Sequence, residues 1–333
     1  MKNALIIGIS GQDGAYLARL LLARGYNVFG TSRDAAANDF VRLRDLGIIG
    51  DVTLTTLDAT VPEQVRQVIA DVQPHELYNL GGLTSVGRSF DEPVEAVRSI
   101  AVATAVLLEG VRQAARSCRF YSAGSSEAFG DSGPSAATET TGFAPKSPYA
   151  SAKADAHWQV ANYRHAYGLF AVTGILFNHE SRLRPADFVV PKIITAAHAI
   201  AHGQQGELVL GDIDVARDWG WAPEYVDAIW RMLQTDVPAD YVVATGHSMT
   251  LREVAADAFD YFGLDWQQHV RTAPEMLRPN ELRHSLGDPA LAKRDLGWRA
   301  HTFGRDLVRT LAEGVAAAAA AATPVSVDAV RAS

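Results

Sequence analysis

The chain has 333 residues, of which 48% are hydrophobic and 20% charged, a balance typical of a folded globular protein with a substantial core. Its formal net charge of −8 argues against nonspecific binding to nucleic acid. A single cysteine, Cys118, excludes an internal disulfide and a zinc site built from cysteines. No apolar run approaches the roughly 20 residues of a membrane span, and the N-terminus enters a strand without room for a signal peptide. We therefore expect a cytoplasmic protein with no membrane partner.

Short apolar runs alternate with amphipathic stretches through the first half of the chain. The expected strands are 4–9, 26–31, 52–57, 76–80, 119–122 and 170–176. The expected helices are 13–24, 62–71, 94–116 and 149–167. Strands that alternate with helices predict a parallel, doubly wound α/β sheet of the Rossmann type, which we assign to residues 1–177.

The pattern becomes less regular after about residue 178. Further helices are expected at 189–202, 223–234, 250–262, 288–296 and 303–322, and strands at 207–210 and 241–244. The helix at 250 begins with a capping box of Thr250 and Glu253. We expect residues 178–322 to form a smaller C-terminal α/β substrate-binding domain, with about 221–246 returning to the first core and 323–333 as a flexible tail.

A glycine-rich turn directly follows the first expected strand and opens the first helix. The glycines are Gly8, Gly11 and Gly14, with Gln12 and Asp13 between the last two. Small residues let the backbone approach a pyrophosphate, which the positive end of the helix dipole attracts. A tight turn without a ligand is the alternative, but the position between strand and helix favours a dinucleotide site.

The end of the second strand bears on the choice of dinucleotide. Ser32 and Arg33 could hold the 2′-phosphate of NADP, whereas an acidic residue such as Asp34 could hold the ribose diol of NAD. Because Arg33 comes first, we predict NADP and keep NAD as the alternative.

Two further strand ends complete the expected cofactor site. Asp58 and Ala59 follow the third strand, where the carboxylate could bond the adenine amino group or merely cap the loop. Leu80 and Gly81 end the fourth strand, where small residues permit a close approach of the backbone to the cofactor.

Tyr149 and Lys153 lie four positions apart on an expected helix and so share one face. A neighbouring ammonium favours the phenolate, so the tyrosine could act as a base below its usual pKa of about 10, and both residues would also contact the cofactor. By itself this spacing fits any surface helix. Ser125 and Glu127 follow the fifth strand, at the carboxyl edge where parallel sheets bind ligands. There the serine could bond a substrate oxygen and the glutamate could act as an acid/base.

With these motifs the chain resembles the GDP-mannose 4,6-dehydratase family of extended short-chain dehydrogenases. The resemblance covers roughly residues 3–315, and its motifs are at 11–14, 78–81, 125–127, 147–149, 169–172, 174–181, 217–220, 278–279 and Glu281. The stretches 178–181 and 217–220 are the ones most specific to this family.

The resemblance implies a redox-neutral elimination of water. Tyr149 would take the proton of the sugar 4-hydroxyl while the hydride of carbon 4 passes to NADP⁺, and Lys153 and Ser125 would assist. Glu127 would remove the proton of carbon 5, water would leave from carbon 6, and the hydride would return there. The substrate would be a GDP-sugar, with GDP-mannose as the first candidate, and the product its 4-keto-6-deoxy form.

The resemblance also implies which residues hold the nucleotide sugar. They are Ser85, Asn178, Lys192, Arg217, Arg278 and Glu281. Arginine forks suit a diphosphate and a carboxylate suits a ribose diol, although an ordinary ion pair is the alternative for each arginine. We assign no catalytic role to His179, and we expect no bound metal.

The chain departs from the family pattern at 83–86, at 182–185 and at Asp34, where the family has a second arginine. The loop after Asp34 also looks short, and in the family that loop helps to build a tetramer. We therefore predict a homodimer through the helices at 94–116 and 149–167 and leave the tetramer open. An NADPH-dependent 4-keto sugar-nucleotide reductase, an epimerase, a dehydratase of another sugar nucleotide and a non-catalytic nucleotide sensor are the alternative functions.

Overall fold

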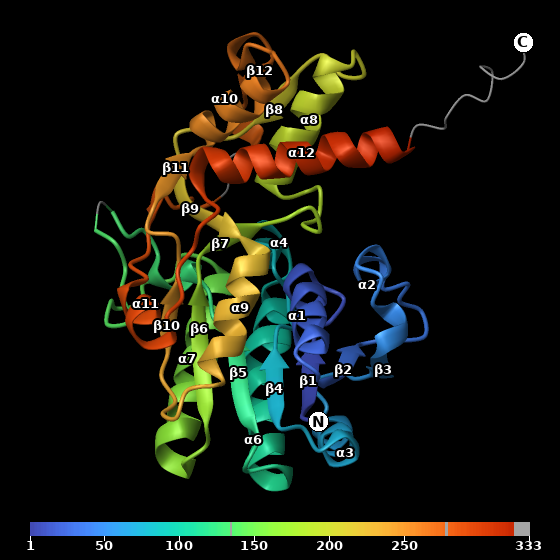
Figure 1. Ribbon diagram of the computed structural model, residues 1–333. Helices are drawn as coiled ribbons and strands as arrows, with labels where there is room; N and C mark the ends of the chain where they lie inside the picture. The colour runs from blue at the N-terminus through green and yellow to red at the C-terminus, as the bar shows by residue number, and fades with distance from the viewer. Residues whose placement is uncertain (134, 277–278, 323–333) are drawn as a thin grey trace, which may run out of the picture.

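A seven-stranded parallel sheet forms the lower half of the molecule (Figure 1). The computed structural model describes residues 1–133, 135–276 and 279–322. The strand order is β10-β6-β5-β4-β1-β2-β3. From β1 the chain adds strands toward one edge of the sheet, as far as β3, and then toward the other edge from β4 on. The strands are β1 (Asn3–Ile7), β2 (Asn27–Ser32), β3 (Val52–Thr56), β4 (Glu76–Asn79), β5 (Arg119–Ala123), β6 (Ala171–Leu176) and β10 (Tyr241–Val243). This confirms the doubly wound sheet, and the glycine-rich turn lies at its switch point.

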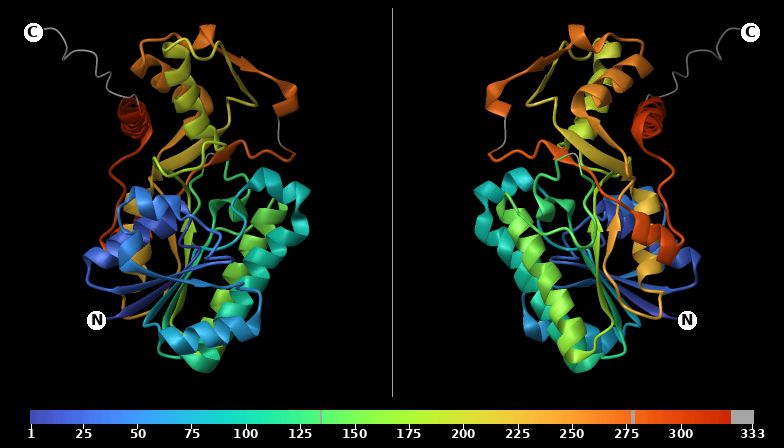
Figure 2. Two further views of the ribbon diagram at one scale, coloured as in Figure 1. Left: turned by 90° about the vertical axis from the view of Figure 1, so that its right-hand side faces the viewer. Right: turned by 90° about the vertical axis from the view of Figure 1, so that its left-hand side faces the viewer.

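Helices cover both faces of this sheet, as the edge-on views show (Figure 2). One face carries α1 (Gln12–Ala23) and α9 (Ala222–Met232), with α2 (Val41–Asp45) and α11 (Ala290–Leu296) at its margins. The other face carries α3 (Pro62–Val72), α6 (Ala103–Ala114) and α7 (Pro148–Tyr167). Because both faces are covered, the inner strands are largely buried, and every residue of β4 and of β6 is buried.

The helix expected at 94–116 is not one regular α-helix. It consists of α5 (Pro93–Val97), a π turn (Arg98–Val102) and α6. The hydroxyl of Ser99 donates to the carbonyl of Glu95 and accepts from the N–H of Leu83, so a side chain competes with the backbone at this point. A short helix that the sequence did not predict, α4 (Val86–Asp91), precedes it and is capped by Ser85.

A second group of elements lies above the carboxyl edge of the sheet (Figure 1). Here β9 (Ala216–Trp221) pairs with β7 (Asn178–Glu180), β11 (Ser248–Thr250) and β13 (His284–Ser285), and β8 (Leu208–Leu210) pairs with β12 (Val270–Thr272). Three helices, α8 (Val189–Ala201), α10 (Leu251–Tyr261) and α12 (Gly304–Ala322), share its apolar core. The capping box of Thr250 and Glu253 is present. Most of these strands span only three residues, too few to show a period in the sequence.

The segment at about 221–246 returns to the large sheet. Its helix α9 packs against α1, and β10 pairs in parallel with β6. The tail expected at 323–333 lies outside the described residues. Within the described part of the chain, none of the helices combines the length and the apolar character that crossing a bilayer requires.

Candidate active site

The glycine-rich turn after β1 brings backbone close to backbone. Gly8 has φ +82°, a conformation that favours glycine. A Cβ on Gly14 would lie 2.5 Å from the carbonyl oxygen of Gly8, so α1 can start this close to the strand only with glycine at that position. The N–H of Gly11 donates to the same carbonyl. The turn and the first residues of α1 therefore form a narrow cradle that fits a dinucleotide pyrophosphate.

The side chains of Gln12 and Asp13 are engaged with β7 and the residues after it. The amide of Gln12 donates to the carbonyl of His179 at 3.2 Å and accepts from the hydroxyl of Ser181 at 2.7 Å. The carboxylate of Asp13 faces the His179 ring at 2.9 Å. These contacts tie the cofactor turn to the strand that carries the 178–181 motif.

His179 is held on both sides by hydrogen-bond acceptors. Its Nδ1 lies 2.7 Å from the carbonyl of Phe177, its Nε2 faces Asp13, and the ring stacks on Tyr225. Two acceptors require a proton on each nitrogen, so the geometry describes an imidazolium beside a carboxylate. Burial lowers the pKa of His179 but Asp13 outweighs it, so the pKa is raised, and that of Asp13 is lowered. The structural contacts of His179 thus link the turn after β1 to β7.

The end of β2 presents one arginine to solvent. The carboxylate of Asp34 accepts the N–H groups of Ala36 and Ala37 and so caps its own turn. The hydroxyl of Ser32 accepts from Asn38. Arg33 extends from the strand end, where its guanidinium reaches another carboxylate, that of Glu95.

The ends of β3 and β4 flank the same edge of the sheet. Asp58 accepts from the N–H and the hydroxyl of Thr60, which lower its pKa, so it caps the loop that includes Ala59. Leu80 lines the central cavity, and a Cβ on Gly81 would lie 3.1 Å from the Ile7 side chain.

The four residues assigned to the chemistry line one cavity of about 350 Å³ between the two halves of the molecule. Ser125 begins the 3₁₀ turn Ser126–Phe129, which carries Glu127 into the cavity. Tyr149 lies in the first turn of α7, capped by Ser147, and Lys153 lies one turn further on. The sequence spacing predicts this convergence.

The electrostatics of the tyrosine differ from our expectation. Burial raises the pKa of Tyr149 to about 12, although a hydrogen bond with Ser125 opposes this, and the charge of Glu127 raises it further. Burial also lowers the pKa of Lys153 to about 8. Its ammonium donates to the carbonyl of Ala123 at 2.7 Å and lies 5.8 Å from the centre of the Tyr149 ring. For both residues, the loss of contact with water is the largest cause of the shift in pKa.

The residues expected to hold the nucleotide sugar line the other walls of the same cavity. They are Ser85, Asn178, Lys192, Arg217 and Glu281. Arg217 is only 6% exposed and pairs with Glu281 at 2.8 Å, so it is no ordinary surface ion pair. The ammonium of Lys192 donates to the carbonyl of Val209. Arg278 lies outside the described residues.

Four charged residues that line the cavity were not predicted from the sequence, namely Glu180, Arg184, Asp187 and Asp212. The guanidinium of Arg184 lies over the ring of Phe188, and its Nε is 3.5 Å from the carboxylate of Glu180. Glu180 is 2% exposed, and burial raises its pKa. In the sequence, Arg184 stood only within a departure from the family pattern. The spacing of four from Glu180 carries no signal here, because Glu180 ends strand β7 and Arg184 lies in the irregular segment before α8.

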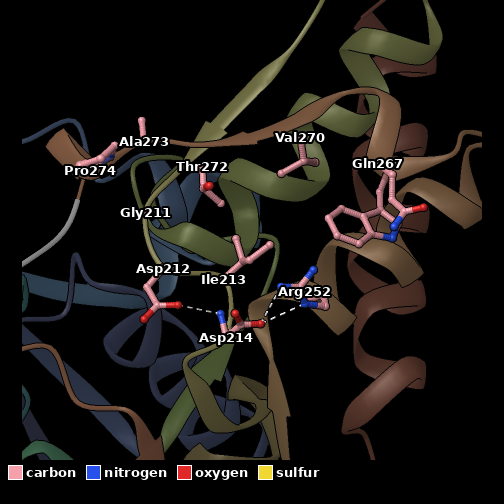
Figure 3. Close-up of a pocket in the computed structure, with 11 residues that line it drawn as sticks. Gly211, Asp212, Ile213, Asp214, Arg252, Gln267, Val270, Thr272, Ala273 and Pro274 are labelled. Carbon is pink, nitrogen blue, oxygen red and sulfur yellow. Dashed lines mark hydrogen bonds and ion pairs between the residues drawn. The ribbon is translucent and has the colours of Figure 1, made fainter.

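A second hollow of about 540 Å³ lies against the outer side of the loop at Gly211 and Asp212, which also lines the first cavity (Figure 3). Its charged groups bind one another: Arg252 donates to Asp214 at 2.8 Å, and the carboxylate of Asp212 accepts the Asp214 N–H (Figure 3). We therefore place the substrate in the first cavity, where the candidate catalytic groups lie.

Comparison with known sequences agrees with this geometry. The family model described as GDP-mannose 4,6 dehydratase matches residues 5–311. GDP-mannose 4,6 dehydratase 2 of Arabidopsis thaliana is 41% identical over 94% of this chain and 86% of its own. The GDP-mannose 4,6-dehydratase of Sinorhizobium fredii is 40% identical over 92% of this chain and 94% of its own, and that of Homo sapiens is 39% identical over 92% and 90%.

Solved structures show the same fold at lower identity. A dTDP-glucose 4,6-dehydratase of Streptomyces venezuelae with NAD bound superposes with a TM-score of 0.84 at 21% identity, over 95% of this chain and 97% of its own. A Thermus thermophilus UDP-glucose 4-epimerase complex with NAD gives a TM-score of 0.83 at 24% identity, over 95% and 99%. These likenesses confirm the expected fold class.

Proposed function

Because the chain belongs to the GDP-mannose 4,6-dehydratase family, we propose that it is a hydro-lyase that converts GDP-mannose to GDP-4-keto-6-deoxymannose. The observation that carries the proposal is one cavity that holds Ser125, Glu127, Tyr149 and Lys153 together with the cationic side chains of Lys192 and Arg217. A base, an acid and groups for an anionic nucleotide are thus within reach of one ligand.

The first step is removal of the proton from the sugar 4-hydroxyl. Tyr149 accepts this proton, and the Ser125 hydroxyl holds the same oxygen as it becomes a ketone. When bound, a nicotinamide dinucleotide supplies the acceptor for the hydride of carbon 4 and the donor that returns it to carbon 6. Since burial raises the pKa of Tyr149 to about 12, the phenolate needs further stabilisation, which the charged form of Lys153 supplies.

The second step is elimination of water. The 4-ketone acidifies the hydrogen of carbon 5, and Glu127 removes it while the hydroxyl leaves from carbon 6. The protonated carboxyl of Glu127 can then donate to that leaving oxygen. A 4-keto reductase would have no use for a carboxylate at this point of the cavity.

The nucleotide part of the substrate would extend toward the second group of elements. Arg217 suits the diphosphate because its guanidinium fork is fixed by Glu281, and Asn178, Lys192 and Ser85 offer further polar groups. We assign Arg278 to the same site from the sequence alone. Residues 1–177 would thus hold the dinucleotide and most of residues 178–322 the nucleotide sugar.

We further propose NADP rather than NAD as the preferred cofactor. The acidic residue that could have held a ribose diol, Asp34, caps its own turn instead, whereas Arg33 extends from the strand end. The glycine cradle at Gly8 and Gly14 suits either dinucleotide. A cytoplasmic location is our inference from the single buried thiol of Cys118, whose pKa burial raises to about 12.

A homodimer would cover an apolar surface that the single chain leaves open. Helices α5 and α7 pack side by side on the outside of the sheet (Figure 2), and Val94 is 78% exposed there and Trp158 57%. Val97 and Val102 add to this surface. Exposed apolar side chains on two adjacent helices favour self-association through that face. We leave the tetramer open.

Mass spectrometry of GDP-mannose incubated with the purified protein and catalytic NADP⁺, without NADPH, tests the proposed reaction. A product lighter by one water establishes the dehydratase. In heavy water, the product should also gain deuterium at carbon 5, because the proton that Glu127 removes leaves with the water and carbon 5 takes a new proton from a group that exchanges with solvent. An unchanged substrate mass, or turnover only with stoichiometric NADPH, would overturn the proposal.

A further inference from the structure

Four charged side chains alternate in sign at the adenosine end of the expected cofactor site. Arg33, after β2, lies 3.2 Å from the carboxylate of Glu95 on α5. Asp58, after β3, lies 3.4 Å from Arg98, at the start of the π turn. The two pairs are neighbours, since both arginines act on Asp58 to lower its pKa. Helix α5 and the π turn thus add two charged residues, Glu95 and Arg98, to the strand ends where the sequence predicted Arg33 and Asp58 as cofactor-binding residues.

Glu95 is the better fixed partner of its pair. Its side chain is 35% exposed, whereas that of Arg33 is 80% exposed. The backbone of Glu95 is anchored as well, because its carbonyl accepts the Ser99 hydroxyl at the π turn. The helix therefore fixes the position of the Glu95 carboxylate, and the guanidinium of Arg33 binds to it there.

A 2′-phosphate would need the same guanidinium. Arg33 is the residue at this strand end that can form a bidentate contact with phosphate oxygens, since Ser32 is engaged by Asn38 and Asp34 by its own turn. NAD carries a hydroxyl in place of the phosphate and makes no such demand. A carboxylate that binds Arg33 consequently weakens the affinity for NADP and leaves the affinity for NAD unaffected.

We propose that Glu95 is a specificity-determining residue that competes with the 2′-phosphate of NADP for Arg33 and so narrows the preference of this chain for NADP over NAD. The proposal deepens the cofactor assignment made above and rests on it, but not on the dehydratase reaction. The Glu95 carboxylate and the 2′-phosphate are like charges that would meet at one guanidinium near the protein surface, and their repulsion predicts roughly a fivefold to tenfold effect on NADP affinity.

Titration calorimetry on the full chain, freed of any co-purified dinucleotide, tests this directly. The ligands are NADP⁺, NAD⁺ and the fragment pair adenosine 2′,5′-bisphosphate and adenosine 5′-monophosphate. In Glu95→Gln, the Kd for NADP⁺ and for the bisphosphate should fall roughly fivefold to tenfold, with those for NAD⁺ and the monophosphate unchanged within about twofold. Glu313→Gln is the matched control, because it removes an equal charge from an exposed pair with Arg309 on α12.

A double-mutant cycle separates competition for Arg33 from a general charge effect. In an Arg33→Ala background, Glu95→Gln should no longer change the ratio of the two dinucleotide affinities. The proposal is overturned if Glu95→Gln changes the Kd values for NADP⁺ and NAD⁺ equally, or leaves the Kd for NADP⁺ unaltered. It is also overturned if Glu95→Gln has its full effect in the Arg33→Ala background, or if the wild-type chain binds neither dinucleotide. Failure of the dehydratase assay with these affinity shifts intact would instead overturn only the proposed reaction.

Discussion

The carboxylate of Asp13, at the start of α1, faces the ring of His179 on β7 at 2.9 Å. Because Nδ1 of the same ring faces the Phe177 carbonyl, the pair is an ionic one, closed on both sides by hydrogen bonds. One member comes from the turn that we assign to the cofactor and the other from the strand that lines the substrate cavity. This contact therefore fixes the two halves of the site relative to each other.

Replacing His179 by Gln should destabilise the protein by about 1–3 kcal/mol, because it removes the nearest counter-charge of the Asp13 carboxylate, whose side chain is 20% exposed. The pKa of His179 is raised on folding, so its contribution is fully present below about pH 6.5 and is lost as the pH rises through the raised value. Because the pKa of Asp13 is lowered on folding, the stability that its carboxylate contributes is lost only at acid pH.

Thermal unfolding of wild type and His179→Gln at a series of pH values checks this. The difference in Tm should be largest near pH 6 and shrink toward alkaline pH. A difference that is constant from pH 6 to pH 10 would contradict an imidazolium at this position.

A methyl group at Gly14 should be poorly tolerated. The added Cβ would lie 2.5 Å from the Gly8 oxygen and 2.6 Å from the Cα of Ile9, both backbone atoms that cannot rotate away. We expect Gly14→Ala to lose more than about 2 kcal/mol of stability and to bind both dinucleotides at least about tenfold more weakly. Gly50→Ala is the control, because its Cβ would meet nothing within 4 Å. Denaturant unfolding and calorimetry measure the two effects, and equal behaviour of the two variants would contradict the cradle.

The sequence predicted the large sheet and the gathering of the catalytic groups for a common physical reason. Parallel strands and their crossover helices have clear periodicity, and residues that follow such strands must meet at one edge of the sheet. Their order along the chain is thus enough to place Ser125 and Tyr149 together.

What the sequence did not predict depends on contacts between distant segments. The pairing of β9 with three short strands has no periodic signature, and neither has the pairing of Arg33 with Glu95, 62 positions away in the chain. The raised pKa of Tyr149 was missed as well, because helical spacing places Lys153 beside the tyrosine but does not reveal how much water both residues lose.

Glu127→Gln should separate the two halves of the reaction. The amide cannot remove the carbon 5 proton, so turnover of GDP-mannose should fall by about 10²–10⁴-fold. Oxidation at carbon 4 remains possible, and reduced dinucleotide should accumulate to at most one equivalent per site, visible by its absorbance. Tyr149→Phe should lose turnover without that accumulation. Comparable turnover in wild type and Glu127→Gln would contradict the assigned role.

Lys153→Met should cost activity without costing stability at neutral pH. Burial lowers the pKa of Lys153 from 10.5 to about 8, so the charged form is disfavoured in the folded state. This penalty, about 3 kcal/mol, is fully present below pH 8 and disappears as the pH rises toward 10.5. In Lys153→Met the carbonyl of Ala123 loses its hydrogen-bond donor, which costs about 1–3 kcal/mol and offsets part of the stability gained by removing the buried charge.

We therefore expect Lys153→Met to have a Tm at pH 7 equal to or above that of wild type, an advantage that declines by pH 10, and at least about 100-fold lower turnover. Scanning fluorimetry at both pH values and the dehydratase assay provide the measurements. A variant clearly less stable than wild type at pH 7 would show that the hydrogen bond to Ala123 outweighs the cost of burying the charge.

Trp158→Arg should convert the expected dimer to a monomer. This indole is 57% exposed on α7, which packs against α5. In a symmetric dimer through this face, the same patch of both copies takes part, so a guanidinium there places a charge in the apolar interface. Light scattering coupled to gel filtration measures the mass directly. Val237→Arg is the control, since Val237 is 73% exposed but follows α9 and lies away from that face. If the dimer survives Trp158→Arg but dissociates with Val237→Arg, the interface lies elsewhere. If the wild-type protein is a monomer, the proposed dimer through α5 and α7 is wrong.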